Sequence, residues 1–146
     1  MLLLSRTIHF NSAHRLFNPG KSEEWNRATY GDATNPAGYG HNYTLEVSVA
    51  GEADADSSMI VNLTDLDRVL REEVDRPLDH RNLNHEIPEF ATRVPTAENL
   101  ARWIWDRVDA RVKKENWPCR LATLKLTVTP NFSVELVSEE ENRGFS

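Results

Sequence analysis

The sequence has a single cysteine, Cys119, so no disulfide bond can form within the chain. It also lacks an apolar run long enough to cross a membrane. The three leucines after Met1 are too few for the apolar core of a signal peptide. These absences are typical of a protein of a reducing compartment, and they predict a cytoplasmic location with no membrane partner.

Positive charge is also in short supply. Lys and Arg number 17 against 23 Asp and Glu, which gives a formal net charge of −6. The densest basic stretch, residues 107–114, is interrupted by Asp109, whereas a nucleic-acid surface needs clustered cations. The composition therefore argues against nucleic acid as a partner.

Familiar catalytic signatures are missing as well. The chain has no glycine-rich phosphate loop, no serine nucleophile elbow and no pair of cysteines. It shows no internal repeat and no linker-like change of composition, and 146 residues suit one domain of ordinary size. We expect residues 1–146 to form a single domain.

Apolar and polar side chains alternate in several segments, which predicts strands, and apolar residues recur at helical spacing in two others. The predicted order is strand, strand, helix, helix, strand, strand, which favours an α+β fold with an antiparallel four-stranded sheet and both helices on one face. Such a sheet has open edges that invite pairing with other subunits. The predicted strands are residues 2–14, 43–50, 123–128 and 132–136.

The helices are predicted from their boundary signals. Asn62 and Thr96 are good N-caps, and Pro77 and Pro118 are expected to end the helices that follow them. Two segments lack a clean period and are expected to be mostly irregular. These segments are residues 15–40 and 78–94.

Two of the five histidines lie where predicted strands end and begin. His14 closes the first strand and His41 precedes the second, so pairing of these strands would bring two imidazoles together as the start of a Zn²⁺ site. On the residues alone, the simpler interpretation, in which each histidine is a separate polar residue at a strand end, is favoured over a shared metal site, and both stay open. We assign His9 and His85 to structure or surface.

The pair Asp79-His80 offers a carboxylate beside an imidazole, a common arrangement for proton transfer near neutral pH. Adjacency in sequence does not establish a hydrogen bond. Glu98, which follows the cap Thr96, is also explained by the preference for acidic residues at a helix N-terminus.

Five stretches, in their order and spacing, make the chain resemble the 6-pyruvoyltetrahydropterin synthase and 6-carboxytetrahydropterin synthase family. The resemblance implies the tunnelling fold (ββααββ), in which the sheets of several subunits join into a barrel within a homo-trimer or homo-hexamer. The stretches are residues 10–16 (FNSAHRL), 35–43 (NPAGYGHNY), 59–63 (MIVNL), 77–84 (PLDHRNLN) and 95–99 (PTAEN).

The resemblance also implies a chemistry. Members of this family are carbon–oxygen lyases that bind Zn²⁺ through three histidines, transfer protons with a cysteine and an Asp-His pair, and hold the pterin ring of dihydroneopterin triphosphate with a glutamate. Carried over to this chain, the family pattern assigns metal binding to His14, His41 and Tyr39, proton transfer to Asp79 and His80, and substrate contact to Glu98 and Thr96.

Three positions depart from the family pattern. Tyr39 stands where the middle zinc histidine is expected, and the catalytic cysteine falls on Ala33 or, in the bacterial spacing, on Asn35. The glutamate that anchors the pterin falls on Val128. A phenolate at Tyr39 suits a harder ion such as iron better than it suits zinc, so the metal is expected to be zinc, another divalent ion or iron.

Three functions are compatible with these departures. We favour a metal-dependent lyase or isomerase that has diverged to an altered small-molecule substrate. The first alternative is ordinary synthase activity on dihydroneopterin triphosphate, with Tyr39 or Asp32 replacing a missing donor. The second alternative is a non-catalytic binding or assembly protein, in which Asp79-His80 is a structural hydrogen bond.

Overall fold

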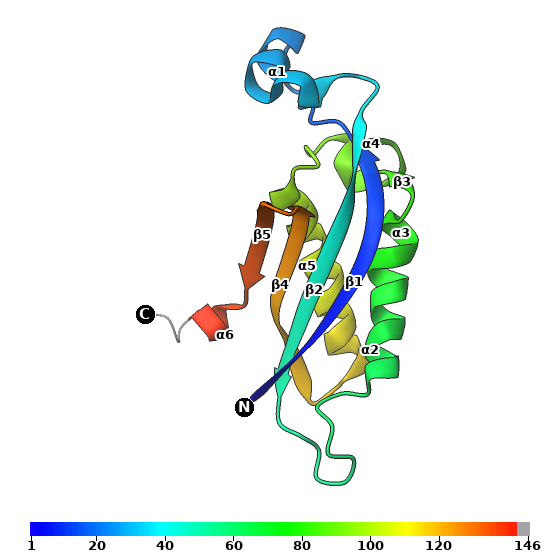
Figure 1. Ribbon diagram of the computed structural model, residues 1–146, viewed down its shortest axis with the longest axis vertical. Helices are drawn as coiled ribbons and strands as arrows, with labels where there is room; N and C mark the ends of the chain where they lie inside the picture. The colour runs from blue at the N-terminus through cyan, green and yellow to red at the C-terminus, as the bar shows by residue number, and fades with distance from the viewer. Residues whose placement is uncertain (143–146) are drawn as a thin grey trace.

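The computed structural model describes residues 1–142, whose centre is one sheet with the strand order β3-β1-β2-β4-β5. Strands β1 (Leu2–His14) and β2 (Tyr39–Gly51) pair antiparallel along their whole length. Strand β4 (Cys119–Thr129) pairs with β2, and β5 (Phe132–Val137) pairs with β4. Figure 1 shows the two long helical segments behind one face of this sheet.

The core lies between that face and the helices. Alternate residues of the central strands, such as Leu45, Val47, Leu124 and Leu126, are fully buried there. The opposite face carries hydroxyl and charged side chains, and the Ser5 and Ser48 hydroxyl groups lie 2.7 Å apart on it. The alternation therefore predicted the strands, although β2 and β4 extend further than the predicted residues 43–50 and 123–128.

The first helical segment is continuous but irregular. It consists of α2 (Leu63–Leu70), a π-helical turn η2 (Arg71–Asp75) and α3 (Arg76–Leu78). Asn62 caps it as predicted, because its side-chain oxygen accepts a hydrogen bond from the Thr64 N–H at 3.0 Å. Pro77 lies at the end of the segment, which stops one residue later at Leu78, close to the predicted end.

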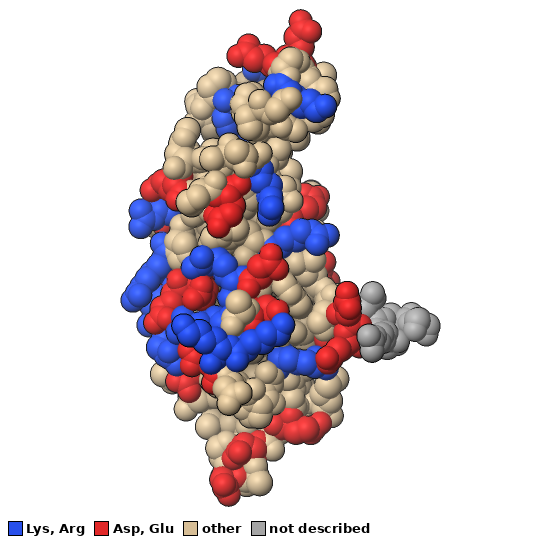
Figure 2. All heavy atoms as spheres, turned by 180° about the vertical axis from the view of Figure 1, so that it is seen from behind, with Lys and Arg blue, Asp and Glu red and all other residues tan. Residues whose placement is uncertain are grey.

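The second helix, α5 (Ala97–Glu115), follows the predicted cap Thr96, whose hydroxyl accepts from the Asn99 N–H at 3.2 Å. Asn116 ends the helix in the left-handed conformation, before Pro118 is reached. Arg111 joins α5 to the first segment by pairing with carboxylates of η2. Figure 2 shows that acidic and basic side chains are interspersed on this helical face.

Residues 15–40 are not mostly loop, as the sequence had suggested. They hold helix α1 (Glu23–Tyr30) and the 3-10 turn η1 (Gly31–Thr34), which Figure 1 shows beyond the end of the sheet. The buried residue of α1 is Asn26, and its side chain bonds to backbone groups such as Asn18 O. An anchor made of polar groups leaves no apolar period in the sequence, which explains the wrong prediction.

Residues 78–94 also contain short elements: β3 (Arg81–Asn82), α4 (Leu83–Glu86) and the 3-10 turn η3 (Pro88–Ala91). Strand β3 runs parallel to the end of β1, so the sheet is mixed and five-stranded. A two-residue strand is too short to produce an alternating pattern. Within residues 1–142, no helix has both the length and the apolar character that a membrane span requires.

Candidate functional site

Four aromatic rings gather where β1 ends and β2 begins. The strand register places His14 directly opposite Tyr39, and His41 follows two residues later on the same face of β2. The ring centroids of His14 and Tyr39 are 4.9 Å apart, those of His14 and His41 are 5.6 Å apart, and those of Tyr39 and His41 are 5.2 Å apart. Tyr43 extends the cluster, with its ring 5.7 Å from that of His41.

His14 is the most deeply buried member of the cluster whose ring can bind a metal. Among residues 1–142, neither of its ring nitrogens has a hydrogen-bond partner of good geometry. Burial and the neighbouring His41 lower the pKa of His14 to about 4, although the nearby Pro95 carbonyl acts in the opposite direction. The imidazole is therefore neutral at pH 7, with an unpaired lone pair.

An unpaired polar atom in a buried site costs about 1–3 kcal/mol, so the free nitrogen of His14 favours a ligand. Burial also lowers the pKa of His41, which keeps the second imidazole neutral. Neutral imidazoles are the form that binds zinc and related ions. The two histidines therefore fit a metal ion, and the third ring of the group, Tyr39, carries an oxygen donor.

The Asp79-His80 pair lies next to the cluster and is fixed to β1. Asp79 Oδ1 accepts a hydrogen bond from the Asn11 N–H at 2.9 Å, and the His80 N–H donates to Asn11 O at 2.7 Å. The Ser12 hydroxyl donates to the carbonyl of Leu78 at 2.6 Å. Three bonds to two adjacent residues of β1 thus set the position of the pair.

Asp79 also orients the imidazole of His80. Its Oδ2 lies 2.8 Å from His80 Nδ1, and the pKa of Asp79 is lowered chiefly by the Asn11 N–H and further by His80. Because the carboxylate is charged near neutral pH, Nδ1 carries the proton and donates a hydrogen bond to Asp79. Nε2 of His80 is then the nitrogen without a proton, as a proton-transfer group would require.

His80 has an unusual backbone conformation. Its φ is +60°, in the left-handed region where residues other than Gly, Asn and Asp are uncommon. The cost of about 1–2 kcal/mol is tolerated because the bonds to Asn11 and the pairing of β3 with β1 hold the segment on both sides. Backbone strain of this kind concentrates at functional sites.

His41 and His80 face one open hollow of about 550 Å³ at the end of β1 and β2. Asn11, Asn42 and Glu86 contribute to its wall. His41, a metal-binding candidate on β2, and His80, the proton-transfer candidate next to β3, thus lie at the same space although they are far apart in the sequence.

The remaining predicted residues are less tightly placed. Thr96 uses its hydroxyl to cap α5, and Glu98 is exposed on the first turn of that helix. Because Pro95 lies against His14, this turn begins beside the ring cluster. Their role in substrate binding stays a prediction. His9 and His85 are exposed, and the structure assigns neither to the cluster.

The three positions that depart from the family pattern also lie near this end of the sheet. Ala33 belongs to η1, and its carbonyl accepts from the Leu16 N–H at 2.8 Å. Asn35 Oδ1 accepts from Arg27 at 2.8 Å, so this side chain is engaged locally. Val128 is half-buried on β4, at the irregularity between Thr127 and Thr129, and packs against the core that includes Tyr43.

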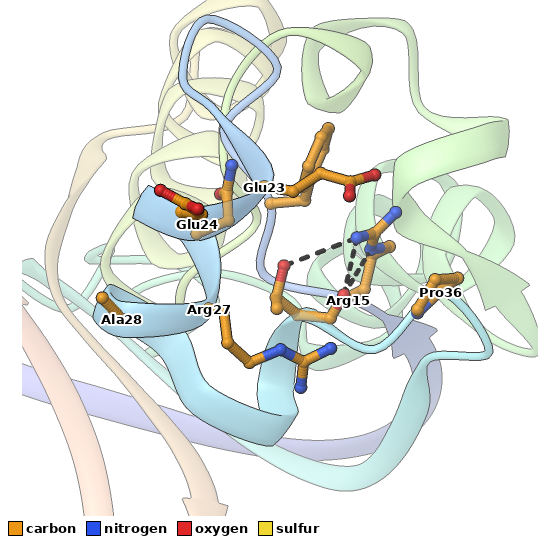
Figure 3. Close-up of a pocket in the computed structure, with 9 residues that line it drawn as sticks. Arg15, Glu23, Glu24, Arg27, Ala28 and Pro36 are labelled. Carbon is orange, nitrogen blue, oxygen red and sulfur yellow. Dashed lines mark hydrogen bonds between the residues drawn. The ribbon is translucent and has the colours of Figure 1, made fainter.

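A second cavity, of about 510 Å³, lies between α1 and the end of β1 and was not expected from the sequence. Figure 3 shows Arg15, Glu23 and Arg27 around it. Arg15 donates to Thr34 O at 2.6 and 2.9 Å and lies over the Phe17 ring. Because α1 has no apolar period, neither the helix nor this cavity could be predicted from periodicity.

Comparison with known proteins gives a consistent result. The family model described as 6-pyruvoyl tetrahydropterin synthase matches residues 3–139. The 6-pyruvoyl tetrahydrobiopterin synthase of Homo sapiens is 44% identical over 105 residues, which is 72% of each chain. The dihydroneopterin monophosphate aldolase of Pyrococcus furiosus is 33% identical over 129 residues, 87% of this chain and 90% of that protein.

The fold agrees with these similarities. The structure of Caenorhabditis elegans 6-pyruvoyl tetrahydropterin synthase matches with a TM-score of 0.86 at 29% identity, covering 94% of this chain and 96% of that one. Fold and site together define a tunnelling-fold domain with two histidines and an Asp-His pair at one end of its sheet. The chain belongs to the 6-pyruvoyl tetrahydropterin synthase family.

We predict that the conformation of His80 can be separated from its chemistry by substitution. His80→Asn should keep the free energy of unfolding within about 1 kcal/mol of the wild type, because Asn adopts a positive φ readily. His80→Val should lower it by about 1–2 kcal/mol, because a β-branched residue resists that conformation. Urea denaturation measures both values, and equal stability of the two variants would contradict the assigned strain.

We also predict that the stability of the metal-free protein falls in acid because of His14. The folded pKa of about 4 lies below the ordinary 6.5, so the unfolded chain binds more protons between these values and stability decreases as the pH falls through them. Between pH 7 and pH 4.5 the loss due to His14 should be about 2 kcal/mol. His14→Gln should remove that part of the pH dependence of unfolding, with His85→Gln as the exposed control.

Proposed function

We propose that this protein is a carbon–oxygen lyase of the 6-pyruvoyltetrahydropterin synthase type that acts on dihydroneopterin triphosphate. The main observation behind this proposal is that His80, which is oriented by Asp79, lines the same hollow as His41. Relatives named 6-pyruvoyl tetrahydrobiopterin synthase support this proposal. They favour it over the altered substrate that the sequence alone had suggested to us.

Proton transfer is assigned to His80. Its Nε2 takes a proton from a side-chain carbon of the substrate, and the Asp79 carboxylate stabilises the imidazolium that results. The same imidazole returns the proton to the carbon or oxygen that needs it. The hydrogen bonds that join Asp79 and His80 to the backbone of Asn11 keep the imidazole at the hollow between these steps.

His14 and His41 would hold the metal ion, which is zinc, another divalent ion or iron. When bound, the ion supplies a positive charge that polarises a substrate oxygen next to the carbon that loses its proton. His41 lines the hollow, and the ring centroid of His14 lies 5.6 Å from that of His41, which fits this division of roles.

The substituted groups define how this enzyme would differ from its relatives. Asp32 is a poor replacement for the missing thiol of position 33, because its side chain is 99% exposed and lies 3.7 Å from Arg27. Val128 cannot accept hydrogen bonds from a pterin ring, and each donor left unpaired costs about 1–3 kcal/mol. We therefore expect slow turnover and weak substrate binding, with Glu98 and Thr96 as the remaining candidates for substrate contact.

The activity can be tested with the purified protein and dihydroneopterin triphosphate. We predict release of triphosphate at a slow but measurable rate, and a loss of at least about 100-fold in kcat for His80→Asn, because general acid–base groups contribute about that factor or more. His85→Asn is the matched control, since it changes an exposed histidine of the neighbouring helix. Turnover that survives His80→Asn would contradict the assignment of proton transfer.

Aldol cleavage of the pterin side chain is the second candidate. It is favoured by the absence of a thiol at positions 33 and 35 and by the similarity to a dihydroneopterin monophosphate aldolase. One imidazole suffices for it, since the base that removes a hydroxyl proton can then protonate the carbon left behind.

Product analysis distinguishes the reactions, because cleavage of a carbon–carbon bond releases an aldehyde and lysis of a carbon–oxygen bond releases triphosphate. Absence of both products would favour a binding or assembly role.

We further propose a homo-trimer or homo-hexamer built through the sheet edges. The outer edges of β1 and β5 are open along most of their length within the described residues, and exposed apolar side chains lie on these strands. Leu3 is 55% exposed and Phe132 is 47% exposed. Such edges are usually covered in a stable protein.

The assembly has a direct measurement. Light scattering should give the mass of three or six chains of 16.7 kDa. Phe132→Glu should shift the population to smaller species, because it places charge on an apolar edge, whereas Ser133→Glu on the polar face of β5 should have less effect. A monomeric wild-type protein would refute the proposal.

A further inference from the structure

We propose that Tyr39 binds the metal as a phenolate, so that the site of His14, His41 and Tyr39 prefers iron(III) to zinc. This inference rests on the metal site proposed above and deepens it. It names the ion from the donor set of this chain.

The ring positions allow all three side chains to reach one ion. A metal bound to an imidazole nitrogen lies about 3.1 Å from the ring centroid, so two histidines on one ion have centroids up to about 6 Å apart. The observed separation of His14 and His41 is 5.6 Å. A phenolate oxygen extends further from its ring than an imidazole nitrogen does, so Tyr39 at 4.9 and 5.2 Å from the two histidines is within the same reach.

The backbone fixes this arrangement. Tyr39 is paired with His14 across the strands, and His41 is the next residue of β2 on the same face. The three donors therefore come from one antiparallel ladder. They need no movement of a loop to meet.

The surroundings leave Tyr39 as the available third donor. Both nitrogens of His14 are buried and without a hydrogen-bond partner, so the Tyr39 hydroxyl does not satisfy them although the two rings are adjacent. Within the described residues, no group of three His, Cys, Asp or Glu side chains is placed to hold a metal ion. Among the described residues of this chain, the third donor nearest to the two histidines is the Tyr39 side chain.

The donor set decides the ion. Two neutral imidazoles and one anionic oxygen have the donor types of the two-histidine, one-carboxylate sites that hold non-haem iron, with a phenolate in place of the carboxylate. A trivalent ion stabilises the phenolate more than a divalent ion does, and the phenol proton leaves to solvent on binding. Zinc also binds two histidines and one carboxylate in catalytic sites, so the preference comes from the phenolate, a hard donor that strengthens binding of iron(III) more than binding of the softer zinc ion.

The test uses the metals alone, without substrate. The chelator-treated full-length protein is titrated with iron(III) supplied as a weak chelate, and its visible spectrum is recorded. We expect one ion per site and a visible charge-transfer band from phenolate to iron(III). Tyr39→Phe should lose the band, whereas Tyr43→Phe, which changes the next tyrosine on the same face of β2, should keep it.

A competition between zinc and iron(III) completes the experiment. Tyr39→His should shift the ratio of bound zinc to bound iron at least about 10-fold toward zinc, as three imidazoles would require. An iron-loaded wild-type protein without the band, a band that persists in Tyr39→Phe, or an unchanged ratio in Tyr39→His would each overturn the inference. None of these readings depends on turnover, so an inactive protein that shows the band would refute the proposed function and leave this inference standing.

Discussion

The register between β1 and β2 is the constraint on which the site depends. Side chains of a strand alternate between the two faces of a sheet, so a slip of one residue would move His14 away from the face that carries Tyr39 and His41. The register is itself fixed by the core, because Phe10 stacks on Tyr43 across the same pair of strands with a centroid distance of 5.0 Å. Packing between two apolar rings thus determines where the two imidazoles meet.

The same strand positions Asp79 and His80, the candidate proton-transfer pair. Asn11 and Ser12 contribute backbone and hydroxyl groups that hold residues 78–80, while the side of β1 that faces the helices ends in His14. The end of β1 therefore positions both the metal-binding and the acid–base candidates. The strained φ of His80 is tolerated because this end of β1 is held firmly in the sheet.

Periodicity in the sequence was sufficient for the sheet and the two main helices, because their apolar faces are buried on one core. It failed for α1, which is anchored by the polar side chain of Asn26, and for β3, which is too short to alternate. It could not show that His41 and His80 line one hollow, because that depends on the parallel pairing of β3 with β1. A pairing of two residues that are far apart in the sequence leaves no local pattern. The contact between Asp79 and Asn11 could therefore not be predicted from the sequence and is seen only in the structure.

The departures from the family pattern change the donors and leave the framework in place. Tyr39 and Ala33 lie at positions whose backbone is held by strand pairing or by the bond from Leu16 to Ala33, and Val128 lies on β4 between the paired residues Thr127 and Thr129. The clamp on Asp79 and His80 uses backbone groups of Asn11, which do not depend on those three side chains. A site built in this way can exchange a metal ligand or a substrate anchor without refolding, because the groups that set its geometry are separate from the groups that were replaced. The acid–base pair and the two imidazoles therefore keep a common geometry while the choice of metal and the strength of substrate binding remain free to change.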